Sequence, residues 1–113
     1  MMRSMMFGVV LLVGVAGIAA AQDKATQEKA KGEQVYADQK CSVCHAVAGK
    51  GNAKGALDDI GSKRSADDIR QWLVDAKAMT AKTKAARKPE MKAYSLPKDE
   101  VDALVAYLTS LKK

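Results

Sequence analysis

The stretch CSVCH, residues 41–45, holds both cysteines of the chain and its single histidine. A disulfide between Cys41 and Cys44 would close a very short loop, so it would remove little entropy from the unfolded chain, and it would leave His45 unexplained. A redox dithiol of the thioredoxin type belongs to an α/β chain, whereas this sequence shows almost no strand patterns. A structural zinc site needs four nitrogen or sulfur ligands, one more than these residues supply. The order C-x-x-C-H is instead typical of covalent haem attachment.

The spacing of these residues has a geometric reason. Thiols at positions i and i+3 of one helical turn project to the same side, where each can bond a vinyl group on one edge of a porphyrin. The residue that follows the second cysteine can then reach the iron. The sequence therefore predicts one haem c, attached through Cys41 and Cys44, with His45 as an axial ligand of the iron.

The second axial ligand has few candidates. Because the chain has one histidine, that position is left to methionine, lysine, water or no ligand. Outside residues 1–21 the methionines are Met79 and Met91. Met79 lies on the apolar face of a predicted helix, where packing in the core is the commoner role. Met91 follows Pro89 in a charged segment and lies on no helical stripe, so a core role explains it poorly. We predict Met91 as the second ligand and keep Met79 as the alternative.

The first residues have the pattern of a signal peptide: Arg3, an apolar run, and alanines at residues 19–21. We expect residues 1–21 to be cleaved before Gln22, which leaves a domain of residues 22–113 in the periplasm. A retained membrane anchor is the alternative, but residues 7–21 fall short of the roughly 20 apolar residues of a spanning helix. Export also argues against nucleic acid as a partner.

Hydrophobic periodicity predicts an all-α domain. A polar helix is expected over residues 24–39, a second helix begins after the N-cap Ser65, and the strongest apolar stripe predicts a last helix over residues 98–111. Residues 46–57 are glycine-rich and are expected to be irregular. The chain has one Trp, three Tyr and one Phe, so it is short of large core side chains. A bound apolar cofactor would fill that deficit.

Several short segments, taken in chain order, resemble the small monohaem class I cytochromes c of bacteria: GEQVY, CSVCH, GAL, DDIRQWL, PEMKAY and LPKDEVDALVAYL. The resemblance covers essentially all of residues 22–113. It implies a small cytochrome c-type fold, in which three to four helices wrap around one covalently bound haem. It also implies that Gly32 and Tyr36 of the first helix cross the last helix near Tyr107, which would explain a glycine inside a helix.

Two features depart from that family pattern. The family usually has Gly-Pro-x-Leu after the haem attachment site, where a backbone carbonyl accepts the second ring N–H of the ligating histidine. This chain has Gly55-Ala56-Leu57, and we expect Ala56 to supply that carbonyl. Pro97 stands where a capping side chain commonly opens the last helix. By the same resemblance, Trp72 either packs near the haem propionates or belongs to the ordinary core.

The predicted ligands indicate a function. Iron that is held by an imidazole and a thioether has no open position for a substrate, and a thioether raises the reduction potential. We therefore expect a soluble one-electron carrier, without enzymatic activity, that shuttles electrons between redox partners. If Met91 does not bind the iron, a five-coordinate or weakly ligated haem would make the protein a sensor or a peroxidase-like protein. A third reading is a fixed cytochrome subunit of a larger oxidoreductase complex.

A positively charged stretch supplies a candidate partner surface. The formal net charge of the chain is +6, and residues 77–92, called the basic segment below, concentrate positive charge beside Met91. Its cationic residues are Lys77, Lys82, Lys84, Arg87, Lys88 and Lys92, against Glu90 alone. Such a surface would steer redox partners with acidic docking surfaces into encounter, at a rate that falls as salt rises. Attraction to a membrane surface and a purely solvating role are the alternatives, and we expect a monomer.

Overall fold

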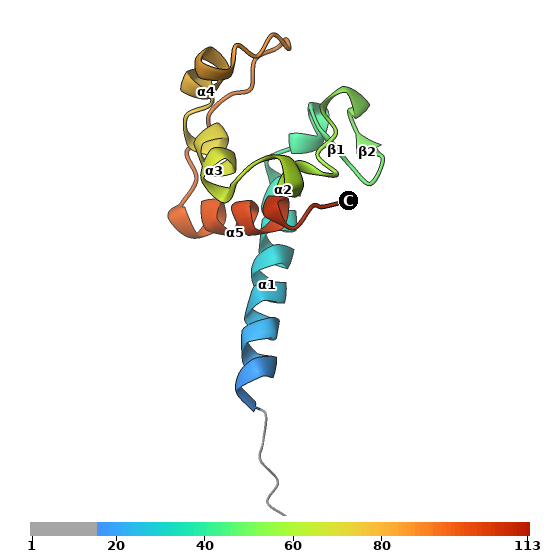
Figure 1. The fold of residues 1–113 in the computed structure, drawn as a ribbon, viewed down its shortest axis with the longest axis vertical. Coiled ribbons are helices and arrows are strands. Elements are labelled where there is room, and N and C mark those ends of the chain that lie inside the picture. The colour runs from blue at the N-terminus through green and yellow to red at the C-terminus, as the bar shows by residue number, and fades with distance from the viewer. Residues whose placement is uncertain (1–15) are drawn as a thin grey trace, which may run out of the picture.

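The computed structural model describes residues 16–113, so most of the predicted signal peptide lies outside the described residues. Its helices are α1 (Ala16–Asp38), α2 (Ile60–Lys63), α3 (Ala66–Val74), α4 (Ala76–Thr83) and α5 (Lys98–Thr109), shown in Figure 1. A two-stranded antiparallel hairpin of β1 (Ala46–Val47) and β2 (Lys50–Gly51) is the only sheet of residues 16–113. The prediction of an all-α fold is confirmed. The predicted cleavage position before Gln22 falls inside α1, and the two-part division of the chain stays a prediction.

The long helix α1 and the last helix α5 cross at a glycine, and this crossing is the centre of the fold (Figure 1). Gly32 of α1 is buried, and a Cβ placed on it would overlap with the backbone carbonyl of Ala103 and lie 2.7 Å from the Cβ of Tyr107. One turn further along, the rings of Tyr36 and Tyr107 meet edge to face, with 5.8 Å between their centroids and 65° between their planes. The predicted crossing of the first and last helices is therefore confirmed.

Helix α3 begins where the sequence predicts it, after Ser65. The Ser65 hydroxyl accepts a hydrogen bond from the backbone N–H of Asp68, and two carboxylates occupy the first turn of α3. The helix ends earlier than expected, because Asp75 leaves helical geometry with φ −146° and ψ 55°. A separate helix, α4, then carries Met79, which is buried.

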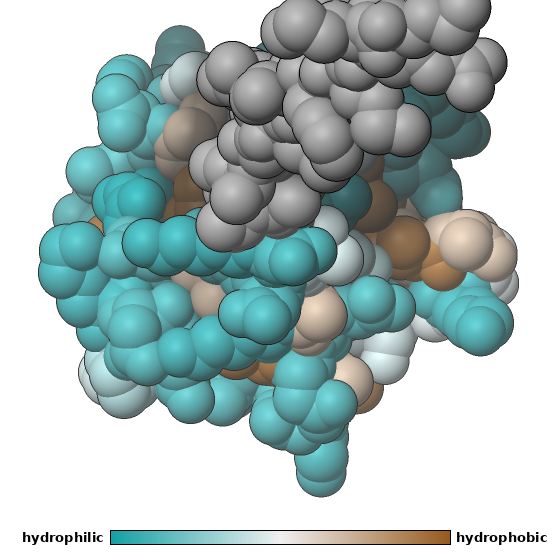
Figure 2. All heavy atoms as spheres, turned by 90° about the horizontal axis from the view of Figure 1, so that it is seen from below, coloured by the Kyte–Doolittle hydropathy of each residue, from teal (hydrophilic) through white to brown (hydrophobic). Residues whose placement is uncertain are grey.

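A small core lies between α1, α3 and α5. Its buried members are Val35, Tyr36, Ile69, Leu73, Val101, Leu104, Val105, Tyr107 and Leu108. In the view of Figure 2, hydrophilic residues cover most of the surface outside the grey atoms, and hydrophobic residues show mainly in the gaps between them. None of the helices in residues 16–113 combines the length and the apolar composition that a membrane span requires.

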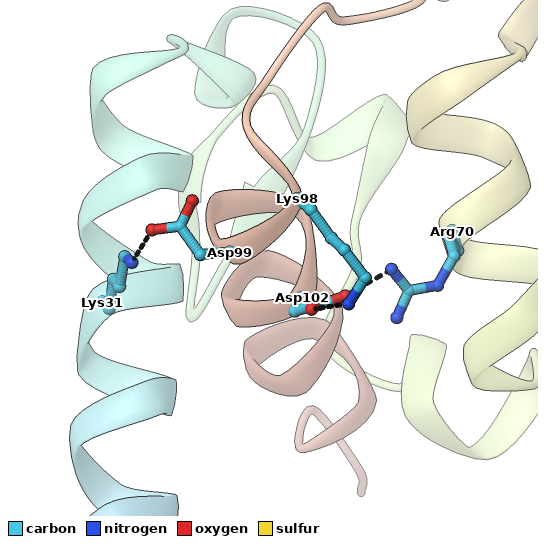
Figure 3. Close-up of polar contacts among 5 residues, drawn as sticks. All are labelled: Lys31, Arg70, Lys98, Asp99 and Asp102. Carbon is cyan, nitrogen blue, oxygen red and sulfur yellow. Dashed lines mark hydrogen bonds and ion pairs between the residues drawn. The ribbon is translucent and has the colours of Figure 1, made fainter.

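Ion pairs fasten α5 to the helices on either side of it (Figure 3). Lys31 of α1 pairs with Asp99 at 2.5 Å. On the other side, Asp102 receives hydrogen bonds from Arg70 of α3 at 2.6 Å and from Lys98 at 2.7 Å. The same carboxylate therefore joins two neighbouring helices.

We expect Asp102→Asn to lower the free energy of unfolding at neutral pH. The variant's free energy of unfolding should also change less than that of wild type as the pH is lowered. The pKa of Asp102 is lowered, first by the hydrogen bond from Lys98 and then by that from Arg70. A carboxylate with a lowered folded-state pKa stabilises the fold above its unfolded pKa, about 3.9, and loses that contribution as the pH falls through the folded value. The difference between wild type and variant in denaturant unfolding should therefore shrink below about pH 4. Glu33→Gln, on the exposed surface of α1, is the control, and an equal pH response in both variants would contradict the prediction.

Candidate functional site

The two cysteines lie on a single tight turn at the end of α1. Cys41–Val43 form a 3₁₀ turn, in which the backbone N–H of Cys44 and that of His45 both donate to the carbonyl of Cys41, at 3.1 and 2.9 Å. Lys40, with a φ of 56°, reverses the chain between α1 and this turn. The sequence prediction placed both thiols on one helical turn, and the backbone has that form. Both thiols are partly buried.

His45 is oriented by a backbone carbonyl from the glycine-rich loop. Its Nδ1 lies 2.9 Å from the carbonyl oxygen of Gly55. The prediction that Ala56 supplies the acceptor is wrong by one residue. The 3₁₀ turn Ala53–Gly55 points the Gly55 carbonyl at the ring, and the backbone leaves helical geometry at Ala56, with φ −58° and ψ 131°. Gly55 is required at this point, because a Cβ there would overlap with the carbonyl oxygen of Cys44 and lie 2.9 Å from the Nδ1 of His45.

The surroundings of His45 favour the form of the ring that can bind a metal. Burial lowers the pKa of His45, and the charge of Arg87 lowers it further, against the opposing effect of the hydrogen bond to Gly55. The ring is therefore neutral at pH 7. Since Nδ1 faces a carbonyl, it carries the proton and donates, which leaves Nε2 with a free electron pair. A neutral imidazole of this tautomer is a ready axial ligand.

A cavity of about 690 Å³ brings the predicted site residues together. Cys41, Cys44, His45 and Met91 all line it, whereas Met79 does not. Its walls are mainly apolar, and the residues that line it include Leu57, Ile60, Trp72, Leu73, Leu104 and Leu108. The volume is in the range of small-molecule and cofactor sites.

Met91 reaches the cavity from the long connection between α4 and α5. It is partly buried against the hydrophobic core, although the ten residues before it are exposed. The backbone N–H of Tyr94 donates to the carbonyl of Leu73 at 2.8 Å, which ties the segment around Met91 to the end of α3. Met79 instead packs in the interior with 6% of its surface exposed. The two methionines therefore have different environments, as the sequence pattern predicted.

Tyr36 provides a test of whether an additional molecule fits this cavity. Its ring lines the cavity and packs on Tyr107, yet its buried hydroxyl has no hydrogen-bond partner within the part of the chain that the structure describes. Burial raises the pKa of Tyr36 to about 12, so the hydroxyl stays protonated. Buried hydroxyls normally have a partner, and a polar group of a bound cofactor would supply one. Together with the apolar walls and the metal-binding tautomer of His45, this fits a haem.

Sequence reasoning missed some of the residues that line the site. Arg64 and Tyr94 lie in the cavity wall, and Arg87 reaches it from the basic segment. No periodicity marks these positions, because a loop rather than a helix face brings Arg87 and Tyr94 there. Trp72 was singled out in the sequence, and it lines the cavity while remaining partly exposed.

The comparison with known proteins agrees with this geometry. Residues 29–112 match the family model described as cytochrome c. The chain belongs to the cytochrome c family. This confirms the resemblance seen in the sequence. Proteins of the family carry haem c and transfer electrons, and the C-x-x-C-H spacing at Cys41 is that of an attachment site.

One curated relative is a much longer protein. The cytochrome c domain is similar to the protein named "Cytochrome c oxidase subunit 2" of Alkalihalophilus pseudofirmus, with 29% identity over 108 residues. The match takes in 87% of this chain and 30% of that relative, so the chain spans less than a third of the relative's length. No solved structure matches the chain.

The proline that this cytochrome c lacks can be introduced at Ala56. The φ of Ala56 is −58°, which a proline ring permits, and its N–H donates no backbone hydrogen bond among the described residues. The preceding residue is Gly55, which lacks a Cβ, so one of the two groups that usually clash with a proline ring is missing. We expect Ala56→Pro to raise the free energy of unfolding by about 0.4–1 kcal/mol, because it restricts the unfolded chain. Ala48→Pro is the control for denaturant unfolding. The φ of Ala48 is 53°, which a proline ring cannot adopt, so Ala48→Pro should lower the free energy of unfolding. A loss of stability in Ala56→Pro as well would contradict the prediction.

Proposed function

We propose that this protein is a one-electron carrier with a single haem c. Cys41 and Cys44 would hold the haem covalently, and His45 and Met91 would bind its iron. The observation that carries the proposal is that these four residues, and not Met79, line one apolar cavity. The haem supplies reversible one-electron chemistry when it is bound. The protein supplies the attachment, the ligands and the exclusion of water.

The contribution of each residue follows from its surroundings. The Gly55 carbonyl holds the imidazole of His45 with Nδ1 as the donor, so that Nε2 is presented to the iron. The Leu73–Tyr94 hydrogen bond holds the connecting segment, which keeps the thioether of Met91 at the cavity wall. The side chains of His45 and Met91 would then keep the same positions in the oxidised and in the reduced protein. A fixed ligand set keeps the site geometry similar in both oxidation states.

This ligand set favours electron transfer over catalysis. A thioether and an imidazole together leave no open position at which a substrate could bind the iron, and the thioether raises the reduction potential. We therefore propose a carrier without enzymatic activity. We also propose that residues 1–21 direct its export to the periplasm and are removed, so that residues 22–113 act as a monomer.

The partners that we propose are redox proteins with acidic docking surfaces. Residues 81–90 of the basic segment are all exposed, and its carboxylate Glu90 already pairs with Lys88 at 2.7 Å. The remaining positive charge is available for a partner, and its attraction should weaken as salt rises. The same charge would also support peripheral association with an anionic membrane surface.

A second candidate function is that of a cytochrome subunit or domain in a larger oxidoreductase complex. The similarity to a protein named as an oxidase subunit favours it. In that case the protein would be recovered from native extract with a stable partner, whereas a diffusible carrier would be recovered alone. The electron-transfer role of the haem would be the same.

The test of the proposed function is the visible spectrum of the exported protein, ferric and then reduced with dithionite. We expect sharp low-spin bands after reduction, a weak far-red thioether-to-iron band when oxidised, and a haem that resists acid-acetone extraction. A high-spin spectrum with rapid binding of carbon monoxide to the ferrous form would instead favour the sensor or peroxidase reading. A protein that binds no haem would overturn the proposal.

A further inference from the structure

Arg87 belongs to the exposed basic segment, yet its guanidinium reaches the histidine side of the cavity. A Cβ placed on Gly55 would overlap with Nη1 of Arg87 as well as with the carbonyl of Cys44. The guanidinium therefore lies directly on the Gly55 backbone, whose carbonyl oxygen is 2.9 Å from the Nδ1 of His45. A permanent positive charge sits beside the hydrogen bond that orients the axial ligand.

Arg87 also faces solvent, on the edge where the cysteine turn is exposed. It lines a second pocket with Val43, Cys44, Asn52, Lys54 and Lys88. Val43, between the two cysteines, is 68% exposed, so the turn that bears the cysteines opens at this surface. Arg87 thus has one side toward His45 and another toward any protein that docks here.

We propose that the charge of Arg87 raises the reduction potential of the haem, and that a carboxylate of a docked redox partner lowers it by pairing with Arg87. The inference rests on the proposed function and adds its regulation: docking and redox potential are coupled through one side chain. The partner is an acidic protein surface, because a guanidinium binds carboxylates in a planar, two-pronged geometry.

The direction of the effect follows from the charge of the iron. Reduction adds one electron to the iron and, in the simplest case, no proton, so the net positive charge of the site falls by one. A fixed cation nearby repels the oxidised form more than the reduced form and so favours reduction. An anion paired with the guanidinium cancels part of that field, which makes electron release easier. The Arg87 guanidinium lies against the Gly55 backbone, and the Gly55 carbonyl oxygen is 2.9 Å from the Nδ1 of His45, so the charge lies close to the proposed ligand.

The test compares the midpoint potentials of three variants of the haem-loaded protein. Arg87→Gln removes the charge, Arg87→Lys keeps it, and Lys82→Gln removes an equal charge from a residue of the basic segment that does not line the cavity. At low salt we expect Arg87→Gln to reduce the equilibrium constant for reduction roughly 3- to 10-fold, and a tenfold change corresponds to about 59 mV for one electron. Arg87→Lys and Lys82→Gln should each stay closer to wild type, and high salt should narrow the difference.

Two further measurements separate an electrostatic effect of Arg87 from a change in the ligands of the iron. The far-red band should persist in Arg87→Gln, which shows that the ligands are intact and that the shift is electrostatic. Added poly-glutamate should lower the midpoint of wild type but not that of Arg87→Gln. With the ligands intact, a midpoint in Arg87→Gln equal to that of Lys82→Gln, or a poly-glutamate shift that survives the substitution, would overturn the inference and leave the proposed function standing. A wild-type protein without the His/Met spectrum would overturn both.

Discussion

Replacing Met91 with alanine is expected to turn a six-coordinate, low-spin haem into a high-spin or water-ligated one. Met91 lines the cavity from the connection between α4 and α5, and it is partly buried against the core. Alanine has no thioether, so the methionine ligand of the iron would be lost. The far-red band should disappear, carbon monoxide should bind the ferrous form rapidly, and the reduction potential should fall.

Met79 provides the matched comparison for this prediction. Because it is buried outside the cavity, Met79→Ala should lower stability by about 2–5 kcal/mol while the spectrum stays low-spin. The pair Met91→Leu and Met79→Leu separates the two effects further, since leucine conserves volume and usually costs less than about 1.5 kcal/mol in a core. Only Met91→Leu should lose the far-red band. Loss of that band in the Met79 variants alone would reverse the assignment of the second ligand.

Sequence reasoning reached Met91 through chemistry and pattern together. The chain has one histidine, and Met91 fits no apolar stripe, so a ligand role was the better explanation for it. Met79 fits the spacing of a helix face, and burial in α4 agrees with that pattern. The crossing at Gly32 came from the resemblance to a known family, because one sequence alone does not say which helices meet.

Other features of the site depend on backbone detail that periodicity does not encode. The acceptor for His45 is Gly55 and not Ala56, a difference decided by the 3₁₀ turn of Ala53–Gly55. The break between α3 and α4 occurs at Asp75, where no proline or glycine announces it. The sequence pattern around Arg87 predicts only an exposed charged residue. The path of the connection between α4 and α5 is what brings its guanidinium to Gly55. Such contacts join residues that are distant in sequence, so they appear only once the chain is folded.

Replacing Gly32 with alanine should destabilise the whole domain through its central helix crossing. The added Cβ would overlap with the backbone carbonyl of Ala103, which cannot rotate away, and it would also press on the Cβ of Tyr107. Overpacking of this kind costs about 1–3 kcal/mol, occasionally more, while alanine regains roughly 1 kcal/mol of helix propensity. Because the overlap is with backbone atoms, we expect a cost at the upper end of that range and a net loss of about 2 kcal/mol, or a fall in Tm of roughly 8–16 °C for a domain of this size.

The control for Gly32→Ala is Lys29→Ala, on an exposed position of the same helix, where the change should stay within about 0.5 kcal/mol. Thermal and denaturant unfolding of both variants, with the haem spectrum recorded in each, separates packing from ligation. Because α1 leads within three residues into the turn that bears Cys41, a separation of α1 from α5 would also displace the attachment turn. A Gly32→Ala protein as stable as wild type would mean that the two helices can move apart freely, and the close crossing would then not be what holds the cavity together.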